Sequence, residues 1–170
     1  MAEILPRVIL REELEALRVN IISNHFKAGQ KASGRTAESL HVEVTDEEGI
    51  LYGRKAFGVL ETGRKGGRVP RNFQGIIIQW LKDKGIQAAP IPYLTDRPHK
   101  YTPEQRGVLR MSYLIARKIR REGTRLYRSG GRNDIYSQEI ERTIGNVEDR
   151  MLRVIRAEIE HIKLNNVEVN

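Results

Sequence analysis

The chain of 170 residues contains no cysteine, so disulfide bonds and thiolate metal sites are excluded. No apolar run approaches the roughly 20 residues that a membrane-spanning helix needs. The first seven residues, MAEILPR, lack the basic segment and apolar core of a cleaved signal peptide. We therefore expect a cytosolic protein that has no membrane partner.

Signals for catalysis are also missing. None of the four histidines stands at metal-ligand spacing from a second ligand with a third nearby. The carboxylates fall in expected turns or on helix surfaces, and the serines have helical or turn contexts, so no Ser/His/Asp set can be assigned. We expect no catalytic residue, no metal and no cofactor, and hence a protein that is not an enzyme.

Positive charge is concentrated in one segment. The formal net charge is +8, and residues 97–132 hold 11 Lys and Arg against 2 Asp and Glu, which leaves a net charge of −1 for the remainder. Such a segment is typical of contact with nucleic acid, contact with an acidic protein surface, or a solvated face.

Within that segment, Thr102-Pro-Glu-Gln105 predicts the start of a helix that ends at Gly123, with a Thr cap and Pro in the first position. Its apolar stripe would be Val108, Met111, Ile115 and Ile119. Four arginines fall on the opposite face: Arg106, Arg110, Arg117 and Arg121. They could line a DNA-containing channel, pair across a subunit interface with Glu139/Glu141 or Glu148/Asp149, or remain solvated.

The N-terminal half predicts a helix and a small sheet. Residues 11–28 have apolar positions at helical spacing, and Leu40, Val42 and Val44 alternate with polar residues as in a half-buried strand. A turn at residues 46–49 predicts a hairpin with a return strand from Ile50. Residues 55–62 would add another strand or an irregular extension.

Further helices are expected over residues 73–84, capped by Asn72 and ended by Gly85, and from Ser137 onward. The last helix carries apolar residues along one side, and Gly145-Asn146 would kink or divide it. The apolar residues are Ile140, Ile144, Val147, Met151, Ile155 and Ile162.

Together these elements predict an α+β fold, with a small antiparallel sheet packed against long amphipathic helices and a helical C-terminal half. We expect an α+β core over residues 1–86, a proline-rich connector over 87–101, a helical region over 102–164 and a frayed tail over 165–170. Because two or three strands leave exposed edges, pairing between subunits and a homo-oligomer are expected.

A glycine-rich basic loop lies between residue 61 and the helix at residue 73. It resembles a phosphate-binding loop only in composition, because the required Lys-Ser/Thr is missing at the helix entry. Glu61 is expected to pair with Arg64 or Arg68. We interpret the loop as a flexible docking loop made of Glu61, Gly63, Arg64, Lys65, Gly66, Gly67, Arg68 and Arg71.

Several of these segments, in this order, resemble a known family. They are GRTAESL at residues 34–40, LETGR at 60–64, IIQWLKDKGI at 77–86 and IARKIRREGT at 115–124, followed by YRSGG at 127–131. The pattern over residues 10–160 resembles the tail-completion, or virion morphogenesis, proteins of long-tailed bacteriophages, which join head to tail. One departure is that the segment from Pro90 to Pro98 leads into an extended helical region, where shorter relatives end.

The resemblance implies a virion structural protein of the neck or tail, made in the cytoplasm of the host bacterium. Such a protein would form a homo-oligomeric ring, commonly of six copies, around the path of the DNA. It would contact neighbouring connector and tail proteins, and make non-specific contact with packaged DNA. The alternative is a DNA-binding accessory protein that uses residues 97–132.

Overall fold

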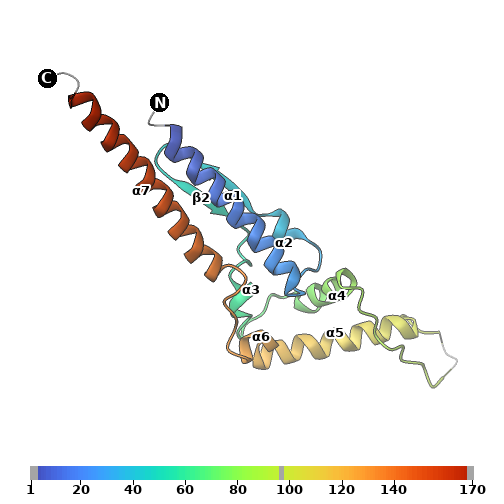
Figure 1. Cartoon of the computed structure of the whole chain (residues 1–170). Coiled ribbons are helices and arrows are strands. Elements are labelled where there is room, and N and C mark those ends of the chain that lie inside the picture. The colour runs from blue at the N-terminus through green and yellow to red at the C-terminus, as the bar shows by residue number, and fades with distance from the viewer. Residues whose placement is uncertain (1–3, 96–97, 168–170) are drawn as a thin grey trace. The chain divides into compact units, whose positions relative to one another are not determined.

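The structure, a computed structural model, describes residues 4–95 and 98–167 (Figure 1). In chain order its elements are α1 (Ile4–Lys27), α2 (Arg35–Glu38), β1 (His41–Val44), β2 (Gly49–Tyr52), α3 (Val59–Thr62), α4 (Phe73–Asp83), α5 (Pro103–Glu122), α6 (Arg125–Arg128) and α7 (Ser137–Val167). The expected α+β class, with a two-stranded antiparallel sheet and a helical C-terminal half, is confirmed.

The elements group into two compact units that interleave along the sequence. One unit comprises residues 1–28, 36–55 and 133–170, and the other comprises residues 29–35 and 56–132. This grouping differs from the expected contiguous division, because α7 packs on α1 while α4 packs on α5. Partner helices are thus far apart in sequence in the first unit and close in the second.

In the first unit, α1 packs on both strands of the hairpin. The strands pair in antiparallel register from His41 opposite Tyr52 to Val44 opposite Gly49. Val44 is buried and His41 is exposed, as the alternation of strand residues predicts. The buried apolar side chains of this unit are Ile9, Leu17, Ile21, Leu40, Val44 and Ile135.

In the second unit, the core lies between α4 and α5. Phe73, Ile77 and Leu81 are buried, and they pack against Val69, Met111, Ile115, Ala116 and Ile119. At the end of α4, Gly85 has a φ of +65° and the amide of Ile86 donates to the carbonyl of Leu81 at 2.9 Å. This left-handed ending is the one that Gly85 predicts.

The expected start of α5 is also confirmed. The hydroxyl of Thr102 accepts from the amide of Gln105, and the side chain of Gln105 accepts from the amide of Thr102. The connector before it, residues 86–95 and 98–102 of the described chain, forms no helix or strand. It still packs on α5, because a Cβ at Gly107 would lie 2.1 Å from the carbonyl oxygen of Ala89.

Several local expectations differ from the structure. The first helix was expected from residue 11, but α1 begins at Ile4. Residues 59–62 form the helix α3, where another strand or an irregular extension was expected. Local bonds hold it, such as the amide of Leu60 donating to the carbonyl of Phe57 at 3.0 Å. Gly145 does not divide α7, because a single glycine costs a helix only about 1 kcal/mol. Asn72 precedes α4 but makes no side-chain capping bond. The helix α7 runs on to Val167, and residues 168–170 of the expected tail lie outside the described residues.

Within the described ranges, no helix combines the length and the apolar character that crossing a bilayer requires.

Candidate docking site

The start of the glycine-rich loop is fixed by backbone hydrogen bonds. The amide of Arg64 donates to the hydroxyl of Thr124, and the amide of Thr124 donates to the carbonyl of Arg64, each at 2.9 Å. The amide of Gly67 donates to the carbonyl of Arg120 at 2.7 Å. The loop expected to be flexible is therefore tied to the C-terminal end of α5 and to the start of α6.

Close approach of two backbones explains the glycine at position 63. Gly63 has a φ of +68°, and a Cβ there would lie 2.4 Å from the amide nitrogen of Tyr127. A side chain would be strained by its conformation and would collide with backbone atoms. Gly63 thus allows α3 and α6 to contact each other.

Other residues of the loop divide into buried and exposed groups. Glu61 is 3% exposed, and its carbonyl accepts from the amide of Arg132 at 2.9 Å. Lys65, Arg68 and Arg71 are exposed. The three exposed cations remain available for a partner, whereas Glu61 belongs to the packed base of the loop.

Arg64 has a more constrained position than its loop neighbours. Its guanidinium donates to the carbonyl of Arg68 at 2.8 Å and lies 5.3 Å from the centre of the Phe73 ring. Its Nε atom is buried and has no hydrogen-bond partner within the described residues. A buried donor without an acceptor is costly, so the packing around Arg64 carries a polar penalty at this atom.

Arg64 lines a pocket of about 910 Å³ that lies entirely within the second unit. Apolar side chains from four separate elements form most of its wall. They are Val59, Leu60, Trp80, Ile115, Ile119 and Leu126. Since Ile115 and Ile119 also pack on the core, the pocket opens directly over the α4–α5 core.

The charged residues that line the pocket are all basic: Arg64, Lys84, Lys118, Arg125 and Arg128. Lys84 donates to the carbonyl of Gly29 at 2.6 Å, and Arg128 lies 3.1 Å from Glu122. Lys118 and Arg125 are exposed and have no ion pair among the described residues. Glu122, the ion-pair partner of Arg128, also accepts a hydrogen bond from Arg121, which holds the pKa of Glu122 below its ordinary value. The pocket lining therefore combines apolar side chains with five cations, which we call its basic rim.

The four arginines of the α5 basic face have different environments. Arg110 and Arg117 are exposed, and Arg121 pairs with Glu122. Arg106 donates to the carbonyls of Ile91 and Pro92 at 3.1 and 2.9 Å, and its guanidinium lies 3.9 Å from the centre of the Tyr93 ring. Arg106 thus holds the connector on α5, and the other three face outward.

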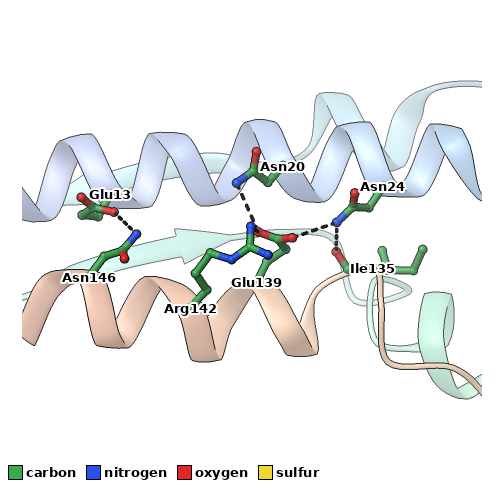
Figure 2. A network of polar contacts seen from close by, with 7 residues as sticks. All are labelled: Glu13, Asn20, Asn24, Ile135, Glu139, Arg142 and Asn146. Atoms are coloured by element: carbon green, nitrogen blue, oxygen red, sulfur yellow. Dashed lines mark hydrogen bonds and ion pairs between the residues drawn. The ribbon is translucent and has the colours of Figure 1, made fainter.

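In the first unit, α1 and α7 meet through polar side chains (Figure 2). Glu139 is only 9% exposed and accepts from Asn20 at 3.2 Å and from Asn24 at 3.3 Å. Farther along, Asn146 and Arg150 donate to Glu13 at 3.1 and 2.8 Å. The residue numbers rise on one helix as they fall on the other, so the two helices are antiparallel.

This polar contact leaves the apolar side of α7 uncovered in the single chain. Six side chains are between 40% and 59% exposed: Ile140, Ile144, Leu152, Ile155, Ile159 and Ile162. At roughly 100° per residue they lie within an arc of about 120°. The charged residues on that arc between Ser137 and Ile162 are Glu141, Glu148 and Glu158. We call this surface the α7 apolar face. It is an uncovered apolar stripe, and its only charged residues between Ser137 and Ile162 are acidic.

The pairing of Glu13 with Arg150 predicts a pH dependence of stability. The hydrogen bond from Arg150 lowers the pKa of Glu13 from its usual value of 4.5, so the folded chain binds fewer protons there than the unfolded chain. The stability that this pair contributes is present above the usual pKa and is lost as the pH falls through the lowered one. We expect thermal melts between about pH 6 and pH 3 to show a smaller loss of stability in Glu13→Gln than in the wild type.

The control is Glu47→Gln, which makes the same chemical change at an exposed carboxylate of the hairpin turn. Parallel profiles for Glu13→Gln and the wild type would contradict the assignment.

The two units differ strongly in charge. The second unit has 19 Lys and Arg against 5 Asp and Glu, a net charge of +14, and the first has 11 against 17, a net charge of −6. We call them the basic unit and the acidic unit. The basic segment recognised at residues 97–132 is thus part of a larger basic unit that also includes the glycine-rich loop.

No group of three His, Cys, Asp or Glu side chains that could hold a metal ion occurs within residues 4–95 and 98–167. No protein-family model, curated protein or solved structure matches this chain.

The loop and the α5 arginines were predicted as surface features from their composition and spacing. The pocket was not predicted, because its wall joins residues as distant as Gln30, Trp80 and Leu126. The last helix was expected to carry an apolar stripe, and the structure adds that much of this stripe is exposed. Glu139 and Thr143, on the neighbouring side of α7, are polar and buried. A polar side that packs against α1 is the sequence signal that could have indicated an exposed apolar side.

Proposed function

We propose that the chain is a non-enzymatic structural component of a bacteriophage particle, a tail-completion or neck protein that assembles into a ring around the path of the DNA. The observation that carries the proposal is the α7 apolar face, whose six large side chains are exposed in the single chain. Contiguous apolar surfaces of this kind are typical of protein interfaces. The resemblance to tail-completion proteins, carried by motifs in the same order, indicates assembly at the neck or tail of the particle. The expected ring has six copies.

In this role, the ring contacts connector proteins on one side and tail proteins on the other. The exposed cations of the loop, Lys65, Arg68 and Arg71, suit an acidic neighbour or the phosphates of packaged DNA. The outward-facing Arg110 and Arg117 would contribute to the same electrostatic surface.

A second candidate function is that of a DNA-binding accessory protein, and the net charge of +14 on the basic unit favours it. Such a protein would bind duplex DNA with a steep dependence on salt, and Arg110→Glu with Arg117→Glu would weaken binding. DNA binding would not need the α7 apolar face. The structural role depends on that face, whereas the DNA-binding role depends on the cations of the basic unit.

The test is the composition of phage particles. We expect mass spectrometry of particles purified from the producing host to find the chain in a fixed, small copy number, and electron microscopy to place it at the neck or the head-proximal end of the tail. Absence from purified particles would contradict the proposal, whereas presence only in soluble complexes with DNA would favour the accessory protein.

A further inference from the structure

Each chain has an apolar pocket with a basic rim and an apolar helix face with acidic residues. We propose that the pocket of the basic unit receives the α7 apolar face of a second copy, at the end of that face that contains Ile140 and Ile144. This inference rests on the proposed ring-forming function and adds the two surfaces that would join its subunits.

Charge complementarity selects a second copy as the occupant. The charged residues of the pocket wall are five cations, and those of the α7 apolar face are three carboxylates. The same relation holds between whole units, with net charges of +14 and −6. Opposite potentials of this kind guide two surfaces together and disfavour pairing of like surfaces. A pocket-to-pocket contact would be repulsive, and so would a contact between two acidic helix faces.

The spacing of the helix residues suits the pocket. Ile140 and Ile144 are one helical turn apart, and Glu141 and Glu148 lie beside them on the same arc. A volume of about 910 Å³ lies toward the upper end of the roughly 300–1,000 Å³ found for ligand pockets, which leaves room for several side chains. Laying the apolar side of an amphipathic helix on an apolar groove is a common mode of recognition.

The rim offers specific partners for the incoming carboxylates. Lys118 and Arg125 have no ion pair among the described residues, and the buried Nε of Arg64 has no acceptor there. Glu141 and Glu148 of a second copy would supply acceptors for the exposed Lys118 and Arg125. A carboxylate paired with a guanidinium forms a stronger hydrogen bond than a neutral pair does.

This contact joins two different surfaces, so it is heterologous. Each copy would offer its pocket to one neighbour and its helix to the next, and such contacts build a closed ring when the rotation between neighbours closes. The proposal therefore provides a route from one chain to a ring without any additional protein.

Two variants separate the surfaces. Ile140→Asp with Ile144→Asp disables the helix face and leaves the pocket intact. Lys118→Glu with Arg125→Glu lowers the net charge of the pocket lining from +5 to +1 (three cations against two carboxylates) and leaves the helix intact. All four positions are exposed, so circular dichroism should show both variants folded. We expect each variant alone to sediment as a monomer where the wild type assembles. An equimolar mixture should form a pair of one chain each and grow no further, because only one competent interface remains.

Three results would overturn the inference. If the pocket variant assembles like the wild type, the ring forms through another surface, and the proposed function stands without this interface. If the mixture stays monomeric while the wild type assembles, the two surfaces do not bind each other. If the wild type itself is monomeric at every concentration, the ring-forming function fails together with the inference.

Discussion

The Ile144→Asp variant is expected to remain monomeric at concentrations at which the wild-type chain assembles. Ile144 is 53% exposed on the α7 apolar face, one helical turn from Ile140 and one from the acidic Glu148. Burying an isoleucine contributes about 1.5–3 kcal/mol, and an aspartate at that position would also have to lose its hydration. Each subunit contact should therefore weaken by at least about 10-fold to 100-fold. A closed ring contains several such contacts, so the combined effect should abolish assembly.

A matched substitution controls for the added charge. Val19 on α1 is 55% exposed, so Val19→Asp makes the same change from an apolar residue to aspartate on another surface of the acidic unit. Sedimentation velocity at increasing protein concentration should show wild-type assembly for Val19→Asp and monomers for Ile144→Asp. Equal behaviour of the two variants would show that the α7 apolar face is not the interface.

Leu81→Ala should strongly destabilise the basic unit. Leu81 is 2% exposed and packs with Phe73 and Ile77 against α5. Its truncation removes buried methyl groups and leaves a cavity, which typically costs about 2–5 kcal/mol. Because Ile115 and Ile119 line both this core and the pocket, we also expect weaker assembly. Thermal or urea unfolding measures the loss of stability directly.

The control for this prediction lies on the same helix. Ile76 is 49% exposed, so Ile76→Ala removes a similar volume from α4 without opening a cavity, and it should cost about 1 kcal/mol or less. If the two variants lost the same free energy of unfolding, the core of the basic unit would not lie where Leu81 is buried.

Helix boundaries with strong local signals could be predicted from the sequence. The end of α4 at Gly85 and the capped start of α5 at Thr102 depend on a few neighbouring residues, whose hydrogen bonds are decided within one turn. The hairpin follows from the alternation of Val42 and Val44 with polar residues. The short apolar run Val59-Leu60 is compatible with a strand or a helix. The helix α3 forms there with local hydrogen bonds, such as that from the amide of Gly63 to the carbonyl of Val59.

Longer-range features could not be predicted in the same way. Helical periodicity shows that Ile140, Ile144 and Ile155 share one side of α7, but it does not show which side meets α1. Polar residues such as Glu139 made that contact possible, because Asn20 and Asn24 on α1 satisfy its carboxylate. The pocket depends on segments that the fold brings together from residue 29 to residue 128, and no sequence period records that proximity.

The most direct test of the account is the native mass of the purified wild-type chain. Native mass spectrometry at low salt should give a single closed oligomer whose mass is an integer multiple of 19.5 kDa, with six copies as the expected number. Raising the salt concentration should favour smaller species, because opposite charges contribute to the proposed contact. A mass of one chain at every concentration and salt tested would contradict the account.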